Sequence, residues 1–267
     1  MSNVLRGFSL AFAAFREQAR AEKAHIGNFW FGVLSKLIYN TMFLLFIDQL
    51  YARVGHFAGY SKNDFLFLYL TSQLGFYICY YGIFFPMQRL VQIVRNGNFD
   101  LLLLKPVPHR SFMYIQGMQP YDLIFTAAPS VAILAFLINW GTLQITLGSL
   151  LLGLVVWTSG IVICNTIVFV LALPVFKTGD ATDTLSTFYS ISSIGQMPYS
   201  HLPGFLKIAA LVVFPQIIIA GAASEVMLMK ADMIGVTTLI ATVAVVSIFA
   251  VNLLWRYALR NYTSVSS

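Results

Sequence analysis

Charged residues are scarce in this sequence. Asp, Glu, Lys and Arg make up 10% of the 267 residues, whereas about 25% is typical of soluble domains. Hydrophobic residues account for 58%, so too few charges remain to cover a soluble surface. At roughly 20 residues per crossing, six crossings with short loops use up the whole chain. The composition predicts an all-α integral membrane protein of six transmembrane helices, with residues 1–267 as one transmembrane domain.

Motifs for the commonest catalytic sites are also missing. The sequence has no GxxxxGK[ST] phosphate loop, no HExxH, no CxxC pair and no GxSxG elbow, so nucleotide, zinc and serine-hydrolase sites lack their minimal donors. The two cysteines, Cys79 and Cys164, lie inside apolar runs, as small buried hydrophobes do. No two of the four histidines stand at metal-ligand spacing. We therefore expect no catalytic residue, metal or cofactor in this chain.

Apolar runs long enough to span a bilayer occur at residues 29–47, 65–85, 121–138, 145–173 and 234–255. Residues 1–25 place Phe8, Phe12 and Phe15 on one helical face and charged residues elsewhere, which is typical of an amphipathic helix in the headgroup plane. We therefore predict five clear spans and an N-terminal interfacial helix.

Basic residues lie at the edges of the apolar runs, not in a cluster with exposed aromatics, so they indicate topology and not nucleic-acid binding. Placing the N-terminus in the cytoplasm puts eleven of the sixteen inside: Arg6, Arg16, Arg20, Lys23, Arg89, Arg95, Lys105, Arg110, Lys177, Arg256 and Arg260. Outside lie Arg53, Lys62, Lys207 and Lys230. This asymmetry predicts a multi-pass protein of the inner (cytoplasmic) membrane, with an even number of crossings and both termini cytoplasmic.

Residues 184–229 are apolar but too long for one straight span, and Pro198, Pro203, Gly204 and Pro215 interrupt them. An even total requires an odd number of crossings here, which we take to be one. We expect the fifth crossing to begin at 184–197, and residues 198–229 to form a re-entrant segment on the outer side. The Ser and Thr residues of 184–197 favour a helix facing a polar path, or else close helix packing through small residues.

Lys36 is the clearest charge inside a predicted span, and such charges are functional candidates. The alternative is that its long stem reaches back to the cytoplasmic headgroups. Asp48, Asp122 and Glu225 lie near span ends, where an interfacial carboxylate is ordinary.

The cytoplasmic loop after the second span is the most informative segment, and its central part, residues 87–108, reads MQRLVQIVRNGNFDLLLLKPVP. Leu90, Ile93 and Val94 recur at helical spacing, opposite a polar side that includes Arg89 and Arg95. Gly97 is expected to end this short amphipathic helix. The pattern predicts either a partner-binding surface or a connector anchored at the membrane.

Part of the same loop, RNGNFDLLLLKPVP, resembles the G-x-x-D-x-x-L-L-K/R-P signature of ABC-2 type permeases, in the six-helix group described as ABC-2 family transporter protein. The C-terminal LWRYALRNYTSVSS is similar to the ending of that group, a Trp followed by L-R-x-Y-x-S. The likeness extends over essentially the full chain.

The resemblance implies an ABC-2 (type V exporter-like) permease subunit whose loop, residues 86–111, acts as a coupling helix on a separate ABC ATPase. The residues expected to couple are Arg89, Leu90, Ile93, Val94, Arg95, Gly97, Asp100, Lys105 and Pro106. ATP and Mg²⁺ are expected in the ATPase, and a second permease subunit, identical or homologous, is expected beside this one.

We expect the substrate to be amphipathic, lipid-like or drug-like, because the expected pathway has aromatic and Ser/Thr side chains and no charged site at mid-membrane. The rival functions are a secondary transporter or channel, which would show facing intramembrane charges or an inverted repeat, and a membrane-embedded enzyme or assembly scaffold.

Overall fold

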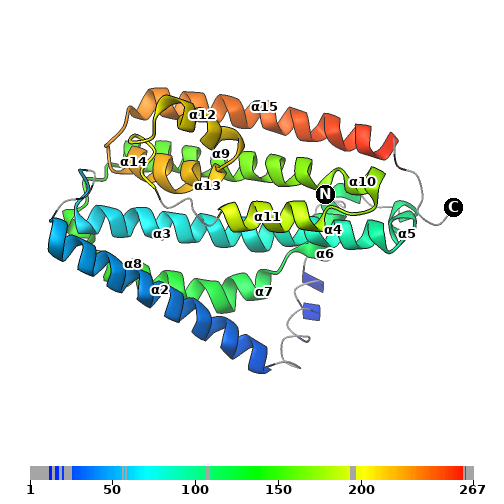
Figure 1. Cartoon of the computed structure of the whole chain (residues 1–267), viewed down its shortest axis with the longest axis horizontal. Coiled ribbons are helices and arrows are strands. Elements are labelled where there is room, and N and C mark those ends of the chain that lie inside the picture. Colours follow the sequence, from blue (N-terminus) through cyan, green and yellow to red (C-terminus); the bar gives the residue numbers. More distant parts are fainter. Residues whose placement is uncertain are drawn as a thin grey trace.

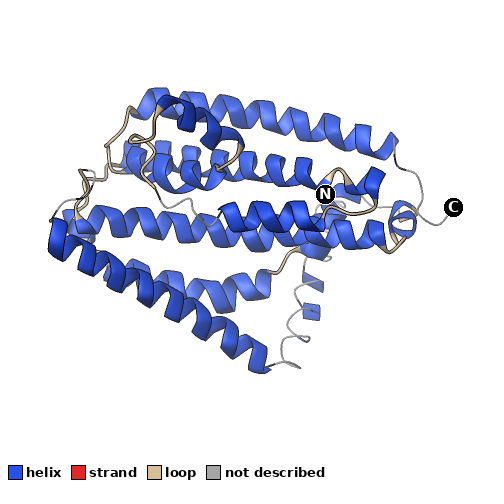
Figure 2. Cartoon of the chain, viewed as in Figure 1, coloured by secondary structure: helices blue, strands red, loops and turns tan. Residues whose placement is uncertain are grey.

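The regular structure of the chain is helical throughout the part described by the computed structural model (Figure 2). Beyond the helices, an isolated bridge joins Phe57 and Tyr60. The described residues are 12–13, 16–17, 20, 26–55, 57, 59–105, 109–192, 197–260 and 262. Of the predicted interfacial helix over 1–25, only five residues are described, and they are helical; the rest lie outside the described residues. The predicted all-α fold is confirmed.

The long helices are α2 (Ile26–Val54), α3 (Lys62–Cys79), α4 (Phe85–Arg95), α8 (Ala128–Leu137), α9 (Leu147–Ala172), α11 (Thr182–Ser192) and α15 (Met233–Arg260). Shorter α-helices are α5 (Phe99–Leu103), α6 (His109–Gly117), α7 (Pro120–Asp122), α10 (Val175–Thr178), α12 (Gly204–Val212), α13 (Pro215–Ile217) and α14 (Ala223–Met227). The described residues also form the π-helical turns η1 (Tyr80–Phe84), η2 (Leu123–Ala127) and η4 (Ile218–Ala222) and the 3-10 turn η3 (Trp140–Thr142).

One continuous helix, made of α3, η1 and α4, runs through the middle of the bundle (Figure 1). It starts in a capping box, in which the Ser61 hydroxyl accepts from the Asp64 amide at 3.2 Å and the Asp64 carboxylate accepts from the Ser61 amide at 3.0 Å. These reciprocal bonds satisfy two amides that the helix leaves free. Helices α2 and α8 pack on one side of this central helix, and α9 with α15 on the other (Figure 1).

The five clear predicted spans all coincide with helices. In the described part of the chain, four helices are long and apolar enough to cross a membrane: Phe29–Val54, Pro120–Leu137, Leu147–Thr178 and Met233–Arg260. The second predicted span, 65–85, lies in the central helix, where tyrosine and glutamine side chains dilute the apolar character. The chain is therefore a multi-pass membrane protein.

The segment 184–229 consists of short helices and a sharp bend. Helix α11 covers the first part of the predicted crossing at 184–197, and residues 193–196 lie outside the described residues. Farther on, Gly204–Ala210 and Pro215–Met227 are together long and apolar enough to cross a membrane, but a bend of 102° separates them. Pro215 begins the second limb, as proline does at a first helical turn. The six-helix count and the outer-side re-entrant segment stay predictions.

Candidate functional site

The central helix ends at a turn made by Gly97, as the sequence predicts. We call this end of the helix its tip. Gly97 has a φ of +71°, a conformation that costs other residues steric energy. Its amide donates to the Val94 carbonyl at 3.0 Å, and the Asn98 amide donates to the Ile93 carbonyl at 2.9 Å. This pair of bonds is a Schellman motif. It ends α4 and turns the chain sharply into α5.

Burial divides the predicted coupling residues into two groups. Leu90 and Val94 are fully buried, packed in the core cluster that also holds residues of α9, α10, α11 and α15. Arg89, Arg95 and Lys105 are exposed, while Ile93, Gly97 and Asp100 are half-buried. Pro106 lies outside the described residues. The expectation that Leu90 and Val94 face a partner needs correction, because the amphipathic face of α4 is filled by this chain's own helices.

Among the described residues at the tip, two leucines are exposed. Leu101 is 61% exposed and Leu104 is 81% exposed. They stand three positions apart across the end of α5, so they share one face. We call the surface formed by Leu101, Leu104 and the exposed Arg95 and Lys105 the tip surface.

Asp180, in the turn between α10 and α11, anchors the tip surface from the side. Its carboxylate accepts from the Thr182 amide at 2.8 Å and lies 3.5 Å from the Arg95 guanidinium. The hydrogen bonds from Thr182, with a smaller contribution from Arg95, lower the pKa of Asp180 to about 2. The carboxylate is therefore ionised at every physiological pH and can orient Arg95.

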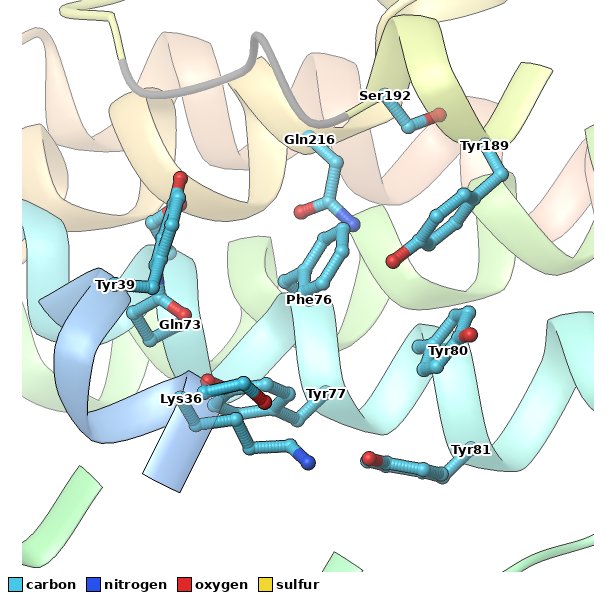
Figure 3. Close-up of a pocket in the computed structure, with 12 residues that line it drawn as sticks. Lys36, Tyr39, Gln73, Phe76, Tyr77, Tyr80, Tyr81, Tyr189, Ser192 and Gln216 are labelled. Atoms are coloured by element: carbon cyan, nitrogen blue, oxygen red, sulfur yellow. The ribbon is translucent and has the colours of Figure 1, made fainter. Parts of the chain in front are cut away.

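A second feature, a cavity of about 530 Å³, lies farther along the same helix (Figure 3). Its aromatic lining consists of Tyr39, Phe76, Tyr77, Tyr80, Tyr81 and Tyr189, and its polar lining consists of Ser35, Lys36, Ser72, Gln73, Ser192 and Gln216. Helices α2, α3, α11 and α13 and the turn η1 all contribute side chains. The volume is within the range of small-molecule sites, which are commonly about 300 to 1,000 Å³.

Stacked rings hold the aromatic wall together. The Tyr80 ring stacks on Tyr189 with centroids 4.6 Å apart, and on Phe76 with centroids 6.0 Å apart. The Tyr80–Tyr189 contact joins the central helix to α11, which follows it by about a hundred residues in sequence. The wall therefore depends on how these two helices pack against each other.

Lys36 lines this cavity. Two interpretations of this residue follow from the sequence, a functional charge inside a span or a snorkelling side chain, and the structure has features of both. Its Nζ donates to the Gly32 carbonyl at 3.2 Å, one turn back along α2, and lies 5.8 Å from the centre of the Tyr81 ring. The stem thus leans toward the start of α2, as a snorkelling side chain does, but the ammonium is half-buried beside tyrosines. The cavity therefore has one lysine among its aromatic, Ser and amide side chains.

The cavity was not predicted, although part of its signal is in the sequence. Gln73, Phe76, Tyr77 and Tyr80 recur at spacings of three and four, which puts them on one helical face. Gln216 follows a proline in the interrupted segment. The sequence around it does not indicate that it packs against the face of Gln73 and Tyr80. The missing information is the long-range packing.

Glu225 forms a third polar centre at the opposite end of the bundle from the tip surface. Its carboxylate is fully buried and accepts hydrogen bonds from the Tyr60 hydroxyl at 2.7 Å, the Ser200 amide at 3.0 Å and the Ser200 hydroxyl at 2.9 Å. Burial and the carboxylate raise the pKa of Tyr60 above its usual value, so the phenol remains a donor. Three separate segments therefore meet at one carboxylate.

Comparison with known proteins gives one match. The family model described as ABC-2 family transporter protein matches residues 37–266. That range includes the central helix, the tip surface and most of the cavity lining. No curated protein and no solved structure matches the chain.

Proposed function

The chain belongs to the ABC-2 family of transporter proteins, and we propose that it works as the permease of an exporter driven by ATP hydrolysis in a separate subunit. Membership of this family makes it a permease component of an ABC transporter. We propose in addition that transport is outward, that an ATPase subunit drives it, and that a second permease completes the transporter.

The observation that supports coupling is the continuous central helix. Its segments of 18, 5 and 11 residues join end to end, so one rigid element carries Gln73, Tyr77 and Tyr80 on the cavity wall and Arg95 at the tip. Force applied to the tip surface is transmitted along the helix to that wall. An ATPase that binds the tip surface would therefore tilt the helix and reshape the cavity when it closes on ATP.

We propose that Leu101 and Leu104 are the apolar anchors for the ATPase, in place of Leu90 and Val94. Exposed leucines on one face suit an apolar groove of a partner. Arg95, Asp100 and Lys105 would lie at the rim of that contact, where each exposed ion pair adds about 0 to 1 kcal/mol. The leucines are therefore expected to matter more than the charges.

The complete transporter in this proposal has two ATPases, which bind ATP and Mg²⁺, and two permeases, identical or homologous. Broad apolar faces remain open on this chain, with Trp30 and Phe31 exposed on α2 and Phe249 and Leu253 on α15. Lipid and a second permease both suit such faces. We propose six crossings, counting the central helix and one crossing from 184–229, with both termini on the cytoplasmic side of the inner membrane.

We propose export of an amphipathic, lipid-like or drug-like molecule through a pathway that includes the cavity. An aromatic wall with hydroxyl and amide groups offers apolar contact area together with hydrogen bonds. The tyrosines would hold the apolar body of the substrate while the polar side chains select its orientation.

The test is purification of the chain from its host membrane in a mild detergent, followed by identification of the bound proteins. An ATPase in stoichiometric amount is expected. The double variant Leu101→Asp/Leu104→Asp should lose the ATPase and its permease-dependent ATP turnover, because two carboxylates would be buried without partners in the contact.

The matched control is Leu147→Asp. Leu147 is 75% exposed at the start of α9, far from the tip surface, and a carboxylate is favourable in a first helical turn. The control should keep the ATPase. If the Leu101/Leu104 double variant also keeps it with full turnover, the tip surface is only a connector.

A further inference from the structure

The charge distribution around the cavity points to a class of substrate. Among the described residues that line it, Lys36 is the one charged side chain and none is a carboxylate. The carboxylate of Asp122 acts electrostatically on Lys36 from α7 without lining the cavity. A ligand inside therefore meets a positive charge directly and the balancing negative charge only at a distance.

The hydrogen-bonding capacity of the Lys36 ammonium is only partly used. An ammonium carries three N–H groups, and the partner of Nζ within the helix, the Gly32 carbonyl, is also the ordinary acceptor for the backbone amide of Lys36. That oxygen is shared, so it satisfies the ammonium only in part. An anionic group in the cavity would supply a stronger, charge-assisted acceptor.

Gln216 gives a second and independent observation on the other side of the cavity. Its side chain is only 3% exposed, and its Oε1 is buried without a hydrogen-bond partner among the described residues. Figure 3 shows the amide above the Phe76 ring, with its nitrogen on the side of Tyr189 and its oxygen on the side of Tyr39, across the cavity from Lys36. Buried amide oxygens are normally satisfied, so this one is poised for a donor on a ligand.

Between these two polar points the lining is aromatic. Tyr80 and Tyr189 stack with centroids 4.6 Å apart, and Phe76 and Tyr77 extend the same wall. Flat π faces offer a large apolar contact area to a planar or apolar body. The lining is therefore matched to a molecule with an apolar body and one charged end.

We propose that the cavity binds amphipathic anions, with Lys36 holding the carboxylate or phosphate end and the tyrosine wall holding the apolar body. This inference rests on the proposed transport function for its biological meaning. Binding to the permease alone is nevertheless measurable without any ATPase, so failure of one proposal leaves the other intact. The anion has two possible sources, a free aromatic acid or the phosphate of a lipid headgroup.

The experiment uses the full-length chain in a neutral maltoside detergent and three probes with the same ring: 2-naphthylacetate, 2-naphthaleneethanol and 2-naphthylethylamine. Isothermal titration calorimetry should give affinities in the order anion, alcohol, amine, with the anion at least about tenfold tighter than the alcohol, as one charge-assisted hydrogen bond provides. Equal binding of the anion and the alcohol to the unaltered protein overturns the proposal, whatever the variants do.

Variants then assign the effect to Lys36. Lys36→Met should reduce the affinity for the acid about tenfold and leave the alcohol unchanged, whereas Lys36→Arg, which keeps the charge, should keep most of the affinity. Lys177→Met removes an exposed lysine on α10 and serves as the control for net charge. Undiminished binding of the acid to a folded Lys36→Met protein also overturns the proposal.

Competition separates the two sources. Short-chain phosphatidylglycerol displaces 2-naphthylacetate if the cavity accepts lipid phosphates, while short-chain phosphatidylcholine, which has no net charge, is expected to leave it bound. Failure of phosphatidylglycerol to compete, with binding of the acid intact, assigns the cavity to free aromatic acids.

Discussion

The Tyr60 hydroxyl donates a hydrogen bond of 2.7 Å to the Glu225 carboxylate across a sequence separation of 165 residues. Tyr60 closes the turn between α2 and α3, and Glu225 lies in α14 near the end of the interrupted segment. Ser200 binds the same carboxylate through its amide and its hydroxyl. A single buried carboxylate thus joins the bundle to the proline-rich stretch at one end.

Glu225→Ala is expected to lower the stability of the protein substantially. The change leaves the Tyr60 hydroxyl and the Ser200 amide without their acceptor, and each unsatisfied buried donor costs about 1 to 3 kcal/mol. Thermal unfolding in detergent should show a clear fall in Tm. Glu225→Gln keeps an acceptor oxygen and should lose less. Equal stability of wild type and Glu225→Ala would mean that the three hydrogen bonds contribute nothing net.

Leu90→Ala is expected to destabilise the fold, not only a partner contact. Leu90 is fully buried in the core cluster around α4 and α9, and such truncations cost about 2 to 5 kcal/mol. Leu104→Ala, at an 81% exposed position, is the matched control and should leave the Tm of the isolated permease unchanged. The two unfolding curves measured side by side decide whether this face of α4 belongs to the core.

Gly97→Ala should loosen the turn between α4 and α5. A side chain at a φ of +71° costs roughly 1 to 2 kcal/mol, although an added Cβ would have open space around it. Gly148→Ala is the control, because Gly148 lies within α9 with open space as well and alanine there is expected to stabilise the helix. A Gly97→Ala protein as stable as the Gly148→Ala protein would contradict the backbone argument.

The orientation predicted from basic residues is testable with single cysteines at Ser2, Ser61, Gly141 and Ser266. An impermeant thiol reagent, in a background without Cys79 and Cys164, should label only positions 61 and 141 from outside. Asn63 donates to the Asn139 carbonyl at 2.7 Å, so both labelled positions lie at the same end of the bundle. External labelling of position 266 would refute cytoplasmic termini and an even number of crossings.

Local chemistry made part of the structure predictable. The apolar runs gave the positions of the long helices, because a helix in lipid must satisfy its own backbone over a fixed length. Gly97 gave the end of α4 for an equally local reason. In both cases the cause lies within a few residues of its effect.

Features that depend on distant segments were not predictable. The pattern of Leu90 and Val94 gives an apolar face but not its occupant, and α9, α10, α11 and α15 turned out to cover it. Hydropathy likewise shows one long apolar segment at 184–229, but not the bend of 102° between Gly204–Ala210 and Pro215–Met227. The cavity needed the meeting of α2, α3, α11 and α13, four helices whose relative placement no single segment encodes.

The π-helical turn at Tyr80–Phe84 sets the angle about the helix axis between the side chains of the cavity wall and those at the tip of the central helix. An α-helix advances about 100° per residue, and a π turn accommodates one extra residue in the ladder. Deleting one residue from this turn would therefore restore regular α-helical spacing and leave α4 facing nearly the same way. A residue deleted from the regular α-helix that follows has no such turn to absorb it, and would rotate the side chains beyond it by about 100° relative to the cavity wall. Leu90 would then turn out of the core while the tip rotated with it. A one-residue deletion is thus expected to be tolerated within Tyr80–Phe84 and to be more damaging than most substitutions within Phe85–Arg95.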